Sequence, residues 1–100
     1  MKRYIIDGNF SIDGLRIEEI DIPKPACGQV LVQIRADSLN YRDLLMVTGA
    51  YTRKLPLPLV PLSDGAGEVV EVGEEVSLWK TGDRVIPTFF QKWPGGRVTP

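Results

Sequence analysis

The fold is decided by the stretch Leu62-Ser63-Asp64-Gly65-Ala66-Gly67-Glu68-Val69-Val70-Glu71-Val72-Gly73, which runs on through a polar loop to Thr81-Gly82-Asp83-Arg84-Val85. Residues 68–72 are rich in β-branched side chains, which favour a strand. Gly65 and Gly67 permit backbone torsions and close approaches that a side chain would block. Gly82-Asp83 predicts a turn into a short strand over 84–86, which Pro87 ends. Two strands cannot bury both of their faces, so we expect earlier segments to pack around them.

Composition indicates one small domain with an ordinary core. The chain has 100 residues, of which 43% are hydrophobic and 25% charged, with a formal net charge of −1. This charge offers no field that would hold a nucleic-acid backbone, so no nucleic-acid partner is expected. No apolar run approaches the roughly 18 residues of a membrane span, and none resembles a signal peptide, so no membrane partner is expected. The single cysteine, Cys27, favours a reducing compartment, and hence the cytoplasm.

The first part of the chain predicts three strands. Residues 3–7 alternate as a strand and are followed by a turn at 7–9. In a second strand the apolar residues change from odd positions, Leu15 and Ile17, to even positions, Ile20 and Ile22. This change around Glu18-Glu19 suggests a β-bulge. Residues 23–28 break the pattern. Then a third strand points Val30, Val32, Ile34 and Ala36 to one face, which we expect to be core.

One helix is expected, beginning after Asn40. Its apolar side is predicted from Tyr41, Leu44, Leu45 and Thr48, and Gly49 ends it as a C-terminal cap. Residues 55–61 contain three prolines and predict an extended, ordered loop. Short strands with glycine and proline between them predict a mainly β fold, a small, partly closed β-barrel with one short helix.

The glycine-marked stretch carries a family resemblance. Its pattern of Gly65, Gly67, Val69 to Gly73, followed by Gly-Asp-Arg-Val at 82–85, resembles the N-terminal GroES-like catalytic domain of medium-chain dehydrogenases/reductases. That superfamily includes zinc alcohol dehydrogenases and zinc-free quinone oxidoreductases. The resemblance covers roughly residues 4–87 and implies the same GroES-like barrel.

Asn40-Tyr41-Arg42-Asp43 is the first candidate site. From the residues alone, Asn40 is a good helix N-cap, and Asp43 suits the positive end of the helix dipole. In the zinc enzymes a Cys ligand and an Asp three residues later occupy this place. In this chain Asn40 takes the position of the Cys ligand, Asp43 that of the Asp, and Arg42 that of a Ser/Thr that relays a proton. This combination of residues resembles the zinc-free branch. The resemblance implies catalytic roles for Asn40 and Asp43, with Asn40 and Arg42 also meeting the cofactor and Tyr41 the substrate.

Ser63 and Tyr51 complete the candidate set. Leu62-Ser63-Asp64 reads most simply as a turn, but in the zinc enzymes this place is Gly-His-Glu with a His ligand. Because the chain has no His and one Cys, we expect no zinc and no metal ligand, with Ser63 in a catalytic, hydrogen-bonding role. Tyr51 resembles the tyrosine that lines the quinone pocket of zinc-free relatives. It is equally consistent with a packing residue.

The resemblance implies the N-terminal domain, residues 1–100, of a zinc-independent oxidoreductase acting on quinones or enones by hydride transfer. NADPH or NADH would be bound mainly by a domain downstream of this chain, so the segment by itself is expected to be inactive. Two alternatives stay open: a zinc-type alcohol dehydrogenase-like enzyme, and a GroES-like co-chaperone or binding module.

Apolar residues at 55–61 with Phe89, Phe90 and Trp93 also predict an exposed apolar surface. Through this surface we expect a homo-oligomer, in the form of a dimer.

Overall fold

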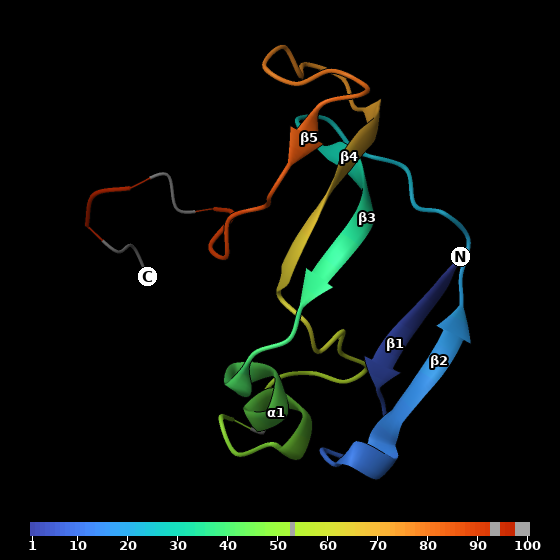
Figure 1. The fold of residues 1–100 in the computed structure, drawn as a ribbon, viewed down its shortest axis with the longest axis vertical. Helices are drawn as coiled ribbons and strands as arrows, with labels where there is room; N and C mark the ends of the chain where they lie inside the picture. Colours follow the sequence, from blue (N-terminus) through green and yellow to red (C-terminus); the bar gives the residue numbers. More distant parts are fainter. Residues whose placement is uncertain (53, 93–94, 98–100) are drawn as a thin grey trace. The chain divides into compact units, whose positions relative to one another are not determined.

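The structure, a computed structural model, describes residues 1–52, 54–92 and 95–97. The chain divides into two compact units, which are described separately (Figure 1). The first comprises Met1–Lys24 and Ser38–Ser63, and the second Pro25–Asp37 and Asp64–Pro100. The predicted residue Trp93 lies outside the described residues.

The first unit contains a two-stranded antiparallel sheet. Strand β1 (Lys2–Ile6) pairs with β2 (Leu15–Glu19), and the 3-10 helix η1 (Ile12–Gly14) leads into β2. The register runs without interruption from Lys2 opposite Glu19 to Ile6 opposite Leu15. The predicted bulge at Glu18-Glu19 is therefore wrong. The change in the apolar pattern has a simpler cause: strand β2 ends at Glu19, and Ile20 and Ile22 lie beyond it.

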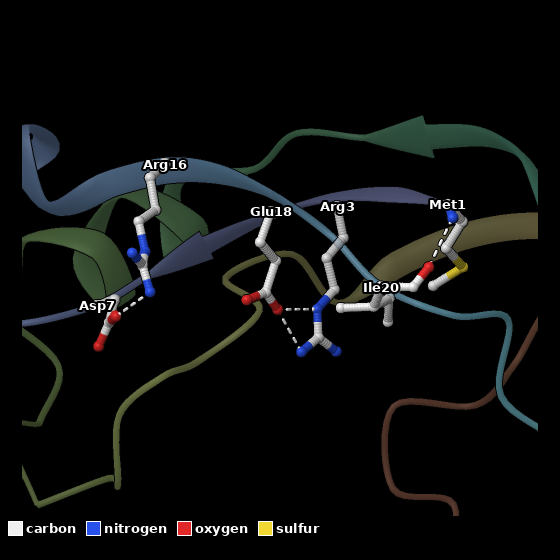
Figure 2. A network of polar contacts seen from close by, with 6 residues as sticks. All are labelled: Met1, Arg3, Asp7, Arg16, Glu18 and Ile20. Carbon is white, nitrogen blue, oxygen red and sulfur yellow. Dashed lines mark hydrogen bonds and ion pairs between the residues drawn. The ribbon is translucent and has the colours of Figure 1, made fainter.

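Polar contacts reinforce this sheet along its length (Figure 2). Arg3 forms an ion pair with Glu18, its partner across the strands, and Arg16 forms one with Asp7. At the open end the Met1 ammonium donates to the Ile20 carbonyl at 2.7 Å. Because these pairs are partly exposed, each contributes about 0.2–1 kcal/mol at most. They fix the register more than they add to stability.

The core of the first unit lies beneath β1. Ile5 and Ile6 are fully buried. The proline-rich loop runs along Ile6, where Leu59 and Ile6 exchange two backbone hydrogen bonds of 2.8 and 3.0 Å. This isolated bridge confirms an extended backbone at Leu59, whereas the backbone bends at Leu55, Leu57 and Pro58, so the predicted extended loop over 55–61 is confirmed only in part.

Helix α1 (Tyr41–Thr48) has the predicted ends. Asn40 is its N-cap, and Gly49 is its C-cap in the left-handed conformation, with φ of 73°. Its buried side, however, is made by Asp43, Met46 and Val47 rather than by the predicted apolar side. Tyr41 is 74% exposed. The helix is rotated from the predicted orientation, and Asp43 lies on its buried side.

The second unit is built on a three-stranded sheet in the order β3-β4-β5. The strands are β3 (Val30–Ser38), β4 (Asp64–Val72) and β5 (Arg84–Val85), and the arrows of β3 and β4 point in opposite directions in Figure 1. Strand β4 begins at Asp64, so the predicted turn at 63–65 is wrong: the chain is already extended there. Asp83 Oδ2 accepts a hydrogen bond from the Lys80 N–H at 2.9 Å, within the predicted turn before β5.

The glycines of β4 explain how β3 packs. A Cβ on Gly67 would lie 2.3 Å from the Gln33 carbonyl oxygen, so the two strands approach more closely there than any side chain allows. Ile34 of β3 is 46% exposed. The expectation that the face of Val30 to Ala36 is core is wrong: Val30 and Val32 are only half-buried, and Ile34 and Ala36 are exposed.

The fold class is as predicted: mainly strands with one short helix. The described strands form two sheets, and neither sheet closes into a barrel. Among the described residues, no helix has the length and apolar character needed to cross a membrane.

Candidate functional site

The N-terminus of α1 gathers three of the predicted site residues in one capping box. The side-chain Oδ1 of Asn40 accepts a hydrogen bond from the Arg42 N–H at 2.9 Å. In return, Asp43 Oδ2 accepts from the Asn40 N–H at 2.9 Å. These two bonds hold the Asn40 backbone and side chain in one conformation while the residue stays exposed.

Two buried oxygens lie among the predicted site residues. Asp43 is 4% exposed, and its second oxygen, Oδ1, has no hydrogen-bond partner among the described residues. The Ser63 hydroxyl is likewise buried and unpartnered. A buried polar atom without a partner costs about 1–3 kcal/mol, so each of these oxygens calls for a partner such as an ordered water or a bound ligand.

Arg42 and Tyr51 form a cation–π pair. The guanidinium carbon of Arg42 lies 5.2 Å from the centroid of the Tyr51 ring. The Tyr51 N–H also donates to the Leu45 carbonyl at 3.2 Å, which attaches the residue to the end of the helix. This contact between Arg42 and Tyr51 was not predicted from the sequence. The signal available was an Arg in the first helical turn with an aromatic residue just after the C-cap Gly49.

Tyr41 is the other tyrosine among the predicted site residues. Tyr41 is 74% exposed, and among the described residues no hydrogen bond or ring contact joins its side chain to the other predicted site residues. An open hollow bordered by Met1 and residues 19–22 shares no residue with the candidate site.

In the second unit, the Cys27 thiol donates to Glu75 Oε2 at 3.2 Å. This contact with the Glu75 carboxylate, followed by slight desolvation, raises the pKa of the Cys27 thiol. Within the described parts of the chain, no group of three or more His, Cys, Asp or Glu side chains is arranged to hold a metal ion.

A family profile described as the alcohol dehydrogenase GroES-like domain matches residues 26–97, which is most of the chain. The chain belongs to this family. Its fold is accordingly the GroES-like fold of medium-chain dehydrogenases/reductases, and the sequence stretch at 62–85 lies inside the matched region.

Individual relatives are oxidoreductases by name. A zinc-type alcohol dehydrogenase-like protein of Schizosaccharomyces pombe is 44% identical over 97% of this chain and 29% of its own length. Acryloyl-coenzyme A reductase of Metallosphaera sedula is 39% identical over 90% of this chain and 26% of its own. The crystal structure of Escherichia coli quinone oxidoreductase complexed with NADPH superposes with a TM-score of 0.70 at 28% identity, over 86% of this chain and 26% of that one. The chain thus spans less than a third of the length of these relatives.

Proposed function

We propose that this chain is the N-terminal catalytic domain, residues 1–100, of a zinc-independent NAD(P)H-dependent oxidoreductase. Its substrates would be quinones or enones. In the quinone reaction, a quinone would accept a hydride and a proton and become a hydroquinone. The single observation that carries the proposal is the capping box of α1, in which a buried carboxylate fixes an exposed asparagine. The named relatives include a quinone oxidoreductase and a reductase of an acryloyl thioester, both of which act on an activated C=C–C=O or quinone system.

The residues fit a nicotinamide cofactor. The carboxamide oxygen of nicotinamide accepts hydrogen bonds, and the Asn40 side chain carries an amide NH2 that can donate at an exposed helix N-terminus, whereas its Oδ1 already accepts from the Arg42 N–H. NADPH or NADH would supply the hydride when bound. The chain's own part would be orientation: Asp43 Oδ2 fixes Asn40, while Asp43 Oδ1 and the Ser63 hydroxyl are buried oxygens that still require partners.

Electrostatics is consistent with this assignment. The positive end of a helix dipole lies at Asn40, where it favours negative charge. Reduction of a carbonyl conjugated to a C=C bond places negative charge on the carbonyl oxygen, so a donor near the helix N-terminus stabilises it. Because Ser63 and Asn40 are neutral, they assist by hydrogen bonding and do not act as Lewis acids.

The other parts of the expected function belong to the same proposal. We retain the absence of zinc, a cytoplasmic location, and self-association as a dimer through exposed apolar side chains such as Phe89 and Phe90. The zinc-type alternative has in its favour the name of the Schizosaccharomyces pombe relative. The co-chaperone alternative has no support from the family assignment, which is to the alcohol dehydrogenase group.

The Asn40→Ser variant of the full-length protein tests the proposal. Serine caps a helix about as well as asparagine, so the melting temperature should hold and the stability should change by only a few tenths of a kcal/mol. If the Asn40 amide also orients substrate or nicotinamide, turnover of quinone with NADPH should fall by roughly tenfold or more, because the shorter hydroxyl does not reach as far.

The outcomes are distinct. Unchanged kinetics in the Asn40→Ser variant would reduce Asn40 to a helix cap. Wild-type protein that oxidises neither NADPH nor NADH in the presence of quinones and enones would contradict the proposed activity itself. Asn40→Ala does not discriminate, because it removes the cap and the amide together.

A further inference from the structure

The Arg42–Tyr51 pair has a geometry that bears on substrate choice. Tyr51 is 60% exposed, Arg42 is half-buried, and the guanidinium carbon is 5.2 Å from the ring centroid. Both backbones are anchored, because the Arg42 N–H donates to Asn40 Oδ1 and the Tyr51 N–H donates to the Leu45 carbonyl. The pair therefore joins Arg42, in the first turn of α1, to Tyr51, which lies two residues beyond the C-cap Gly49.

An exposed aromatic side chain on its own changes rotamer within picoseconds to nanoseconds. A guanidinium over the ring favours one rotamer by attraction to the ring quadrupole and covers one of the two ring faces. What remains accessible is the opposite face and the phenol hydroxyl. A flat ligand can stack on that face, whereas an acyclic ligand gains only the hydrogen bond.

We propose that Arg42 is a positioning residue that acts through the Tyr51 ring and sets a preference for flat, ring-shaped quinones over acyclic enones. The inference rests on the proposed function and deepens it. It assigns Arg42 a role on the substrate side, in addition to the cofactor contact that the family resemblance implies. It also gives Tyr51 one fixed stacking face.

Steady-state kinetics with NADPH on the full-length protein test this role, with 2-methyl-1,4-naphthoquinone and but-3-en-2-one as substrates. The Arg42→Met variant keeps the length of the side chain and removes its charge. At saturating NADPH we expect the ratio of the KM for the naphthoquinone to the KM for the enone to rise about fivefold, because a lost cofactor contact would affect both substrates alike. Arg42→Lys retains a cation and should restore the KM for the naphthoquinone to within about twofold of the wild-type value.

Lys54→Met is the matched control. Lys54 is an exposed cation three residues beyond Tyr51, and its loss should leave both KM values unchanged. A second readout is independent of activity: the δ-protons of Arg42 should resonate upfield in the NMR spectrum of the wild type because of the Tyr51 ring current. This shift should disappear in Tyr51→Leu and persist in Tyr51→Phe.

The results separate the two proposals. Equal KM changes for both substrates, no change for either, or the absence of the upfield shift would overturn the role of Arg42 and leave the proposed function standing. A wild-type protein that reduces neither substrate with NADPH or NADH would overturn the proposed function and, with it, the substrate preference assigned to Arg42.

Discussion

At the scale of single residues, the Cys27 thiol shows how a neighbour sets reactivity. The thiol meets Glu75 because the backbone already joins the two loops: the Gly28 N–H donates to the Glu74 carbonyl at 2.8 Å, and the Gly73 N–H to the Gln29 carbonyl at 2.8 Å. The Glu75 carboxylate favours the protonated thiol, which raises its pKa. A lone exposed cysteine with a raised pKa is a poor nucleophile at neutral pH.

We therefore expect Glu75→Gln to make Cys27 more reactive. Removing the carboxylate charge lowers the thiol pKa, so a larger fraction is thiolate at a given pH below that pKa. The rate of alkylation by iodoacetamide at pH 7.5–8 should rise roughly twofold or more, and the two proteins should converge at high pH. Glu74→Gln, in the neighbouring exposed residue, is the control and should leave the rate unchanged. A slower reaction in Glu75→Gln would show that the carboxylate activates the thiol instead.

The candidate site residues were predictable only in part. Asn40 was predicted as the N-cap of α1, and the structure confirms it, with Asn40 Oδ1 accepting from the Arg42 N–H. The bond from the Asn40 N–H to Asp43 Oδ2 was not predicted, since the residues alone assigned Asp43 to the positive end of the helix dipole. The Arg42–Tyr51 contact was not predictable, because it depends on how the chain turns after Gly49. Nor does spacing reveal that the Ser63 hydroxyl is buried without a partner, since burial is a property of the folded unit.

At the scale of secondary structure, the contact between β3 and β4 depends on Gly67. A Cβ at this position would lie 2.3 Å from the Gln33 carbonyl oxygen and 2.7 Å from Val32 Cγ1. The carbonyl belongs to the backbone of a strand and cannot move without breaking the sheet. At Gly65, by contrast, the nearest atom is a side-chain oxygen, Asp37 Oδ1, at 3.3 Å.

This difference predicts unequal effects of the same substitution. Gly67→Ala should lower the free energy of unfolding by about 1–3 kcal/mol, as overpacking in a closed contact does. Gly65→Ala should stay within about 0.5 kcal/mol of the wild type, because a flexible side chain can give way. Urea unfolding followed by tryptophan fluorescence measures both values. Equal destabilisation of the two variants would show that the glycines serve backbone torsion rather than close approach.

The strands and the helix show what local patterns can predict. Glycine and asparagine marked the two ends of α1 correctly, because caps are set by the backbone within one turn. The buried side of α1 was predicted wrongly, because apolar periodicity alone gives no weight to an inward-turning carboxylate such as Asp43. In β3, too, apolar alternation alone did not predict burial, since Ile34 is 46% exposed.

At the scale of the whole molecule, the family assignment and the chain's own residues give different indications about zinc. The Schizosaccharomyces pombe relative is called zinc-type, and it is 44% identical to this chain. A catalytic zinc needs about three protein ligands, chiefly Cys, His, Asp or Glu. This chain has no His and a single Cys. That Cys donates its thiol hydrogen bond to Glu75, and Asn40 Oδ1 is occupied by the Arg42 N–H.

We therefore expect the protein to retain less than roughly 0.1 zinc per chain after a chelator wash and dialysis, measured by mass spectrometry of the metal content. A zinc-containing alcohol dehydrogenase carried through the same wash is the control and should keep its metal. Chelator should also leave the melting temperature unchanged, because metal binding to the folded state would otherwise appear as lost stability. One zinc held per chain would contradict the zinc-independent assignment. It would favour the zinc-type alternative.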